Sequence, residues 1–300
     1  MNQHILKNIS DPAVFEENRL PAHSDHLVYK NKAELLRGSS SLCYSLNGVW
    51  KFDYSINLSC TPDGFEALDY DCNNWDNIRV PAHIQMEGYD KPHYANVAYP
   101  WDGRQALKSG EVPTDFNPVG SYVKYFTLPN DFIKDSLILR FEGVESAAAI
   151  WLNGHYIGYC EDSFTPSEFD LTKYIVEGEN KLAIQVTKWC AGSWLEDQDF
   201  FRFSGIFRDI YLYTKPKCHL EDIEIKQVFE KDSFENVKLN FSINLSNNAD
   251  VKLVLFDAMD LTLKSNELKA FDEMPVVYES VTNLHSGKNK LSFDVVAPKL

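Results

Sequence analysis

The chain has 300 residues, enough for about two domains of ordinary size. Its hydrophobic fraction of 44% and charged fraction of 24% are typical of globular proteins and argue against wholesale disorder. The net charge of −15 repels a phosphate backbone and disfavours nucleic-acid binding, and no apolar run approaches the roughly 18 residues that span a membrane.

The first residues, MNQHILKNIS, lack the basic segment and apolar run of a secretory signal peptide. We therefore expect a cytoplasmic protein. The six cysteines are widely spaced and form no CxxC pair, so we expect unpaired thiols in place of disulfides or a metal site.

Short runs of alternating apolar and polar residues, separated by Gly, Pro, Asn and Asp, predict an all-β fold. In the clearest run, Leu182, Ile184 and Val186 alternate with a second set of side chains, which predicts one buried and one wetter face. That second set is Ala183, Gln185 and Thr187. Similar runs predict strands in residues 48–55, 120–128, 136–144, 147–154 and 206–216. The best candidate helix, residues 30–37, is short.

A second set of alternating runs begins after residues 215–220 and covers residues 238–247, 251–258 and 289–298. Its length suits an immunoglobulin-like β-sandwich. We therefore predict one domain in residues 1–218 and an immunoglobulin-like sandwich in residues 219–300. A (β/α)₈ barrel does not fit, because it needs about 250 residues of alternating strands and long helices.

The stretch WLEDQDFFRFSGIFRD contains three acids within four positions: Glu196, Asp197 and Asp199. If the segment is extended, the last two face the same way about 6.6 Å apart, a spacing that a glycosidase carboxyl pair could use. Such pairs flank a bond from opposite sides, which disfavours catalysis by neighbours on one strand. The residues alone leave two readings equal: a site for a sugar hydroxyl or a hard cation, and an acidic loop held by Arg202 and Arg208.

The stretch HIQMEGYDKPHYANVAYPWDG interleaves aromatic and polar side chains. Flat aromatic faces beside amide and carboxylate groups can bind a sugar ring, although core packing explains aromatic residues equally well. The two prolines favour an exposed or rim loop. The residues concerned are Tyr89, Asp90, His93, Tyr94, Asn96, Tyr99 and Trp101.

Together these segments resemble the amino-terminal part of the large β-galactosidases of glycoside hydrolase family 2. The resemblance implies a jelly-roll, galactose-binding-like sandwich followed by the immunoglobulin-like domain. The form of the EDQD loop favours galactosides over the glucuronides and mannosides used by other members. The segments that carry the resemblance are residues 18–25, 45–52, 80–101, 117–129, 140–172 and 194–216.

The resemblance implies retaining hydrolysis of terminal non-reducing β-D-galactose by two glutamates in a barrel outside these residues. The chain alone is then expected to have no catalytic residues and no activity. Glu145 and Glu168 match structural segments of the family and are not candidates for the catalytic pair. The alternative is a stand-alone carbohydrate-binding module without activity.

Two site residues carry over from the family. Asp199 matches an aspartate that accepts a hydrogen bond from galactose and helps to hold Na⁺, and Asn96 matches an asparagine that binds the same sugar. Val97 lies beside it at the pocket wall. The bracing residues of the loop are Glu196, Asp197 and Arg202.

The resemblance places the Mg²⁺ ligands in the barrel of the parent enzyme. It implies as partners a β-galactoside, the remaining domains of the enzyme and further copies in a homo-oligomer, with no nucleic acid or membrane. We expect residues 1–20 to be loosely packed, since family members use this segment in oligomer contacts.

Overall fold

The computed structural model describes residues 2–130, 132, 136–197, 199–229, 236–256 and 274–296. The chain forms two compact units. The first unit comprises Met1–Ala22 and Cys43–Thr214, and the second comprises His23–Leu42 and Lys215–Leu300. This division differs from the predicted domain of residues 1–218 chiefly in the placement of residues 23–42.

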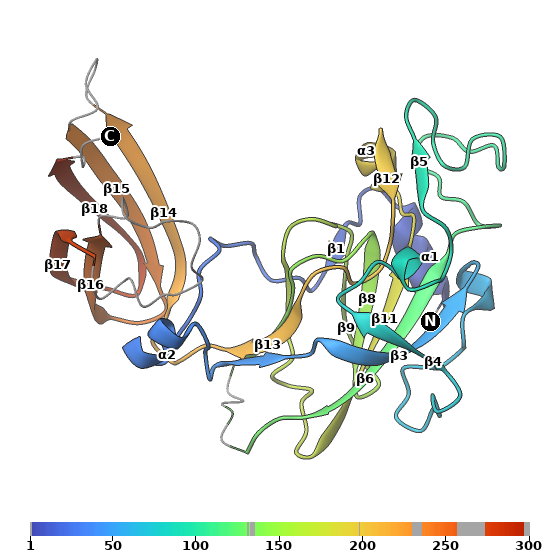
Figure 1. Ribbon diagram of the computed structural model, residues 1–300, viewed down its shortest axis with the longest axis horizontal. Helices are drawn as coiled ribbons and strands as arrows, with labels where there is room; N and C mark the ends of the chain where they lie inside the picture. The colour runs from blue at the N-terminus through green and yellow to red at the C-terminus, as the bar shows by residue number, and fades with distance from the viewer. Residues whose placement is uncertain are drawn as a thin grey trace. The chain divides into compact units, whose positions relative to one another are not determined.

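The first unit is a β-sandwich, which confirms the prediction of an all-β fold (Figure 1). Its larger sheet has seven antiparallel strands in the order β1-β9-β8-β11-β6-β3-β4, and its smaller sheet has four in the order β10-β7-β13-β2. The larger sheet contains β1 (Glu16–Glu17), β9 (His155–Cys160), β8 (Ala147–Leu152), β11 (Glu179–Thr187), β6 (Val119–Thr127), β3 (Gly48–Ser55) and β4 (Asp76–Val80). The smaller sheet contains β10 (Ser167–Asp170), β7 (Leu137–Phe141), β13 (Ile210–Thr214) and β2 (Cys43–Ser45).

Apolar side chains from both sheets meet in the main core. On β11, Leu182 and Ile184 point into this core, as their alternation predicts. They join residues of the smaller sheet such as Leu139 and Leu212, all of them fully buried. Burial of this apolar surface is the main force that holds the two sheets together.

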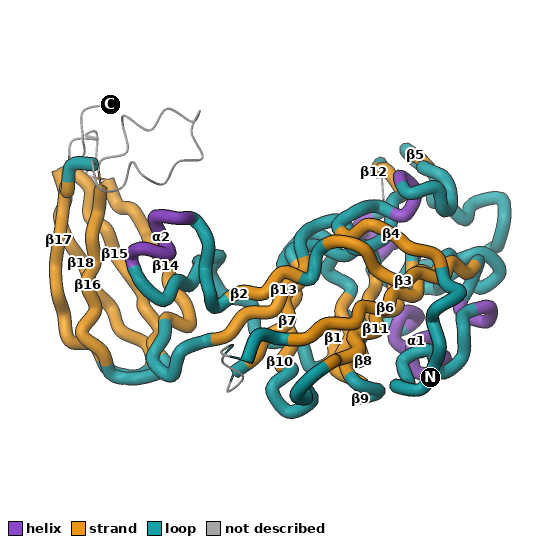
Figure 2. The backbone as a smooth tube through the Cα atoms, turned by 60° about the horizontal axis from the view of Figure 1, so that its bottom comes forward, coloured by secondary structure: helices purple, strands orange, loops and turns teal. Residues whose placement is uncertain are grey.

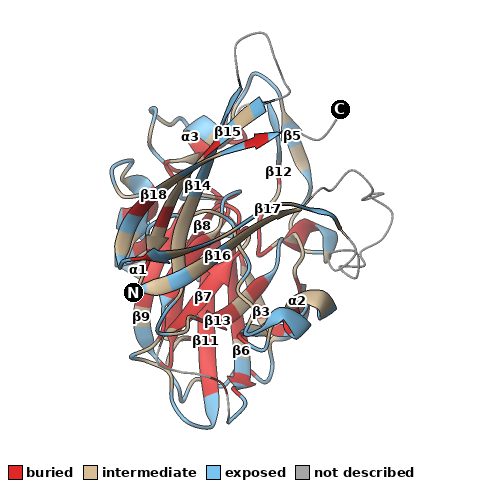
Figure 3. Ribbon diagram, turned by 90° about the vertical axis from the view of Figure 1, so that its left-hand side faces the viewer, coloured by how far each residue is buried: buried red, intermediate tan, exposed pale blue. Residues whose placement is uncertain are grey.

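The opposite face of the larger sheet is also buried, so the prediction of a wetter face on β11 is wrong. Ala183, Gln185 and Thr187 are each at most 1% exposed. Figure 3 shows buried residues along β7, β8 and β11. This second core contains Trp151 of the sheet and Phe65, from a loop that covers the sheet.

The amino-terminal helix α1 (Asn2–Ser10) completes this cover. Ile5 and Ile9 lie one helical turn apart, are each 1% exposed and belong to the second core. The expectation that residues 1–20 pack loosely is therefore wrong for this helix. Its apolar side is needed to bury the face of the sheet.

The remaining elements of the first unit are short. None of the helices in the described ranges is long and apolar enough to cross a membrane. Among the cysteines of the described ranges, Cys60, Cys72, Cys160, Cys190 and Cys218 are free thiols, and Cys72, Cys160 and Cys190 are buried. The short elements are η1 (Leu58–Cys60), η2 (Ile84–Met86), β5 (His93–Ala95), α3 (Ser193–Glu196) and β12 (Phe200–Arg202).

The second unit contains a three-stranded sheet, β14-β15-β18, and a two-stranded sheet, β16-β17. Ile243, Leu245 and Leu284 form its small core. The described elements after residue 219 are all strands, as predicted, and an immunoglobulin-like topology stays a prediction. The predicted helix near Leu35 is confirmed as α2, which Asn31 caps at its start. The elements are α2 (Lys32–Arg37), β14 (Leu220–Phe229), β15 (Asn236–Leu245), β16 (Ala249–Phe256), β17 (Val276–Leu284) and β18 (Gly287–Val296).

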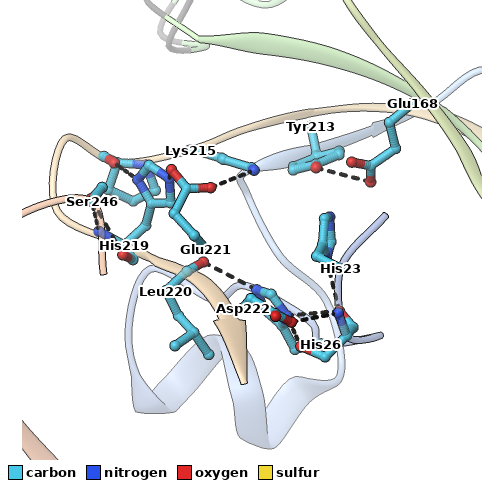
Figure 4. Close-up of polar contacts among 12 residues, drawn as sticks. His23, His26, Glu168, Tyr213, Lys215, His219, Leu220, Glu221, Asp222 and Ser246 are labelled. Carbon is cyan, nitrogen blue, oxygen red and sulfur yellow. Dashed lines mark hydrogen bonds and ion pairs between the residues drawn. The ribbon is translucent and has the colours of Figure 1, made fainter. Parts of the chain in front are cut away.

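Hydrogen bonds to β14 explain why residues 23–42 belong to the second unit. The amide of Ser24 donates to the Asp222 carboxylate at 2.9 Å, and the amide of Ile223 donates to the Ser24 hydroxyl at 3.1 Å. The ring of His26 donates from Nε2 to the carbonyl of Leu220 at 3.2 Å (Figure 4). The predicted boundary missed this pairing because no regular pattern marks residues 23–30.

A buried ionic network ties together the strands of the smaller sheet in the first unit. Arg140 of β7 donates from Nε to Glu142 at 2.7 Å and from Nη1 to Glu168 of β10 at 3.0 Å. Tyr213 of β13 donates to the same Glu168 oxygen at 2.9 Å. The side chains of Arg140 and Glu168 are each only 6% exposed. Glu168 is thus a structural residue, as the sequence implies.

We predict that Arg140→Met lowers the free energy of unfolding of the first unit by about 3–5 kcal/mol, because the Glu168 carboxylate stays buried after it loses the positive charge of Arg140. The double variant Arg140→Met/Glu168→Gln should recover part of that loss, since it removes the uncompensated charge. Urea unfolding of the three proteins measures both effects. A double variant that is less stable than Arg140→Met would contradict this explanation.

Candidate functional site

The predicted site residues lie on a small sheet formed by β5 and β12, which are neighbours in Figures 1 and 2. The two strands run antiparallel, with Phe200 opposite Ala95 and Arg202 opposite His93. Asn96 directly follows β5 and Asp199 directly precedes β12. The pairing therefore brings these two distant parts of the sequence together.

Asn96 and Asp199 are in direct contact through the backbone. The amide of Asp199 donates to the carbonyl of Asn96 at 3.1 Å. Asp199 has φ of 51°, a left-handed conformation that Asp tolerates better than most residues. Both residues are exposed, so their polar side chains are available to a ligand.

Tyr94 is a third member of the site. Its hydroxyl donates to Oδ1 of Asp199 at 2.6 Å, and this hydrogen bond is the main cause that raises the pKa of Tyr94. Within the described ranges, Oδ2 of Asp199 accepts no hydrogen bond and can accept one from a ligand. Sequence reasoning grouped Tyr94 only with the other aromatic residues. Its position two residues before Asn96, on the same side of an extended strand, was the available signal.

The other two acids of the loop have partners of their own. Asp197 ends α3, its side chain is 6% exposed, and its Oδ2 lies 3.6 Å from Nε of the fully buried Arg202. Glu196 accepts from the hydroxyl of Ser163 at 2.9 Å. Asp197 has φ of −92° and ψ of 11°, and Asp199 has φ of 51°, so neither has the extended backbone required for a carboxylate pair. As expected, Glu196, Asp197 and Arg202 brace the loop.

Gly205 anchors the segment that follows β12 to the sandwich. It exchanges two backbone hydrogen bonds with Glu145, at 2.8 and 3.0 Å. Its φ is +117°, and an added Cβ would lie 3.0 Å from both the Ala82 carbonyl and the Tyr122 hydroxyl. A side chain at this position would therefore strain the backbone and push the loop away from its support.

Glu145 is a buried acid below the loop, 3% exposed. Burial raises its pKa to about 8, and the negative charges of Asp197 and Glu196 add to this effect. Burial likewise raises the pKa of Asp197 to about 6. The nearest basic group is the ring of His83, 3.7 Å away, whose own pKa is lowered by burial. At neutral pH, Glu145 therefore keeps its proton.

The site offers few ligands for a metal ion. Asp199 has one available carboxylate oxygen and Asn96 has an amide oxygen, a partial set for a cation that prefers several oxygen ligands. Within the described ranges, no group of three or more His, Cys, Asp or Glu residues is arranged to hold a metal. Asp199 and Asn96 could each offer an oxygen to a cation, and the Na⁺ and Mg²⁺ sites stay predictions.

Large apolar side chains are exposed on the same small sheet and its flanking segments. Val97 is 89% exposed and Leu195 is 88% exposed. Exposed apolar surface of this kind often marks a site of contact with another protein surface. The other members are Tyr94, Phe200 and Phe201.

Comparisons with known proteins give a consistent result. Residues 43–216 match the family described as "Glycosyl hydrolases family 2, sugar binding domain". The chain is 47% identical over 277 residues to a β-galactosidase of Halalkalibacterium halodurans, covering 91% of this chain and 27% of that protein. It is 45% identical over 249 residues to a β-galactosidase large subunit of Latilactobacillus sakei, covering 78% of this chain and 40% of that protein.

Solved structures show the same fold. A β-glucuronidase from Bifidobacterium dentium superposes with a TM-score of 0.61 and 18% identity, over 86% of this chain and 42% of that one. A β-glycosidase from Bacteroides vulgatus gives a TM-score of 0.60 and 20% identity, over 86% of this chain and 30% of that one. At these identities the likeness concerns the fold alone. The chain spans well under half the length of the relatives described here.

We predict that the buried proton on Glu145 makes stability depend on pH. The carboxyl of the unfolded chain ionises near 4.5 and that of the folded protein near 8, so the free energy of unfolding should fall as pH rises through this range. Glu145→Gln removes this contribution, and the variant should gain stability relative to the parent by at least about 1 kcal/mol between pH 5 and pH 8. Urea unfolding at several pH values measures the difference. Glu177→Gln, at an exposed position, is the control, and parallel pH profiles for Glu145→Gln and the parent would contradict the prediction.

Proposed function

Because the chain belongs to glycosyl hydrolase family 2 and carries its sugar-binding domain, we propose that it is part of a β-galactosidase. The enzyme would hydrolyse terminal non-reducing β-D-galactose residues in β-galactosides. Support comes from relatives that are named β-galactosidase and are 41% to 47% identical to this chain. The observation that carries the proposal is the juxtaposition of Asn96 and Asp199, with exposed polar side chains, at the paired ends of β5 and β12.

The chemistry of these two side chains suits a neutral sugar. The Asp199 carboxylate accepts hydrogen bonds only, and its free oxygen can accept from a galactose hydroxyl while Tyr94 holds the other oxygen. The Asn96 amide can donate and accept at once. A hydrogen bond from a sugar hydroxyl to a charged acceptor is stronger than one between neutral groups.

The site covers only one side of a sugar. Asn96, Val97 and Asp199 are all exposed, whereas small-molecule sites usually bury most of the ligand surface. We propose that the remaining wall comes from other parts of the enzyme, docked on the exposed apolar side chains near Val97 and Leu195. Hydrophobic contact there would position the barrel against the loop.

The bond cleavage itself is assigned to residues outside the described ranges. Retaining hydrolysis needs a nucleophile and an acid/base about 5–5.5 Å apart on either side of the glycosidic bond. In this chain Glu145 is buried below the loop and Glu168 is paired with Arg140, so neither can flank a substrate. The chain by itself is therefore proposed to be inactive.

Two cations belong to the proposal. Asp199 would provide one ligand of a Na⁺ ion, and a bound Na⁺ would supply positive charge that orients a sugar hydroxyl. Mg²⁺ would be held by ligands elsewhere in the enzyme. Assembly into a homo-oligomer and a cytoplasmic location stay predictions.

The alternative function is a stand-alone carbohydrate-binding module. The exposed ring of Tyr94, whose centroid lies 5.2 Å from that of Phe201, favours it, because aromatic faces can stack on sugars without other domains. The two functions differ in whether the isolated chain binds galactose.

We predict that Asp199→Ala lowers kcat/KM for a galactoside by roughly 100-fold in the complete enzyme, and that Asn96→Ala lowers it by roughly tenfold. Tyr94→Phe should have a smaller effect, because it leaves the carboxylate in place. Steady-state kinetics measures these changes, and circular dichroism checks that the sandwich stays folded. Asp63→Ala, an exposed acid far along the sequence from the site, is the matched control. A kcat/KM near that of the parent would remove the altered residue from the site.

We predict that the isolated chain binds galactose or lactose more weakly than about 10 mM, since one wall of the pocket cannot offset the free-energy cost of association. Calorimetric titration of the chain and of its Asp199→Ala variant tests this. A dissociation constant of about 1 mM or tighter that is lost in Asp199→Ala would overturn the claim of an incomplete site and support the stand-alone module.

A further inference from the structure

The first unit contains a second candidate binding site, a cavity of about 500 Å³. This volume lies within the range of small-molecule sites, roughly 300–1,000 Å³. Neither Asn96 nor Asp199 lines it, so it is separate from the proposed galactose site. Its lining residues are Tyr54, Asp90, Lys91, Pro92, His93, Arg104, Phe116, Lys188 and Trp189.

One acid and one base of the lining neutralise each other. The side chain of Lys188 is 2% exposed and forms an ion pair with Asp90. Asp90 also accepts a hydrogen bond from Gln85 at 3.1 Å. Both partners bind Oδ2 of Asp90, and the positive charge of Lys188 reduces the repulsion of an anion in the cavity by this carboxylate.

The other two bases of the lining have no such partner. Within the described ranges, the side chains of Lys91 and Arg104 make no hydrogen bond or ion pair, and the guanidinium of Arg104 lies 5.8 Å from the ring centroid of Phe116. The pKa of His93 is lowered first by burial and then by the charges of Lys188 and Arg104, so its ring is neutral. With three bases, one acid and a neutral His93, the lining has a net charge of +2 in a chain whose total is −15.

The remaining walls are aromatic. Tyr54, Phe116 and Trp189 line the cavity, and aromatic rings of this kind can pack against the C–H face of a sugar. The polar atoms of Asp90 and His93 lie among them and can pair with hydroxyl groups. A lining that combines cations, aromatic rings and neutral hydrogen-bonding groups matches a ligand with an anionic group and a polar ring.

We propose that this cavity binds a sugar phosphate, with the phosphate between Lys91 and Arg104 and the sugar ring against the aromatic walls. A phosphate monoester carries about −1.5 to −2 charges at pH 7, which complements the net charge of the lining. The planar guanidinium of Arg104 can donate two parallel hydrogen bonds to phosphate oxygens. His93 lies opposite Arg202 in the β5–β12 pairing, so the ligand would bind at the base of the strands that carry Asn96 and Asp199.

The test is a calorimetric titration of the chain with glucose 6-phosphate, inorganic phosphate and glucose. We expect saturable binding of glucose 6-phosphate, binding of inorganic phosphate at least about tenfold weaker, and no binding of glucose, because the charge and the ring both contribute. The affinity should fall as salt is added. NMR titration of His93 should show its pKa rise when glucose 6-phosphate is bound, since the anion favours the protonated ring.

Substitutions in the cavity lining test whether glucose 6-phosphate binds in this cavity. Lys91→Ala and Arg104→Ala should each weaken glucose 6-phosphate binding about tenfold or more, whereas Lys173→Ala, an exposed lysine outside the cavity, changes the net charge equally and should have no effect. Asp199→Ala should leave this binding unchanged, which separates it from the galactose site. Unchanged binding in both cavity variants, no saturable binding, or equal affinity for inorganic phosphate would each overturn the proposal.

Discussion

The first unit depends on burying both faces of its seven-stranded sheet. One face packs on the smaller sheet, and the other is covered by α1 and the loop that contains Phe65. Consecutive alanines at the start of β8 divide between the two cores: Ala148 belongs to one, and Ala147 and Ala149 belong to the other. Their small side chains allow close approach on both sides. Since close packing makes such an interior rigid, the sheet provides a fixed base for the loops at its ends.

Buried polar groups transmit this rigidity to the candidate site. Gly205 is bonded to Glu145, and the Ser204 amide donates to Gln85 at 3.0 Å, so the chain that leaves β12 is fixed immediately after the strand. Arg202 and Asp197 are buried together before that point. Asp199 is exposed, but the residues on both sides of it are anchored to the sandwich. Its carboxylate can therefore be held in one position without being buried. A binding residue on a loop needs neighbouring residues that hold it in position.

The sequence was informative where local pattern decides structure. Alternation found the main strands, and residues 30–37 were predicted as a short helix, which the structure shows as α2. Prediction from the sequence failed where segments distant along the chain decide which residues are buried. The alternation within β11 does not show that α1 covers the second face of the sheet. The bond between residues 23–26 and β14 was missed for the same reason.

The candidate site shows the same limit. Family motifs pointed to Asn96 and Asp199, and the structure brings them together through the pairing of β5 with β12. The different surroundings of Asp197 and Asp199 could not be read from their spacing. They depend on the end of α3 and on the left-handed backbone of Asp199. The hydroxyl of Tyr94 reaches Asp199 only because the two strands pair in this register.

The division of the chain also limits how it can be taken apart. The backbone passes from one unit to the other three times, after residues 22, 42 and 214. Cleavage at any one of these points leaves both units covalently joined. A fragment that ends near residue 214 keeps residues 23–42 but loses the β14 groups that satisfy Ser24 and His26. The two units are therefore interleaved along the sequence, and a gene for the first unit alone would have to join residue 22 to residue 43 through a new linker.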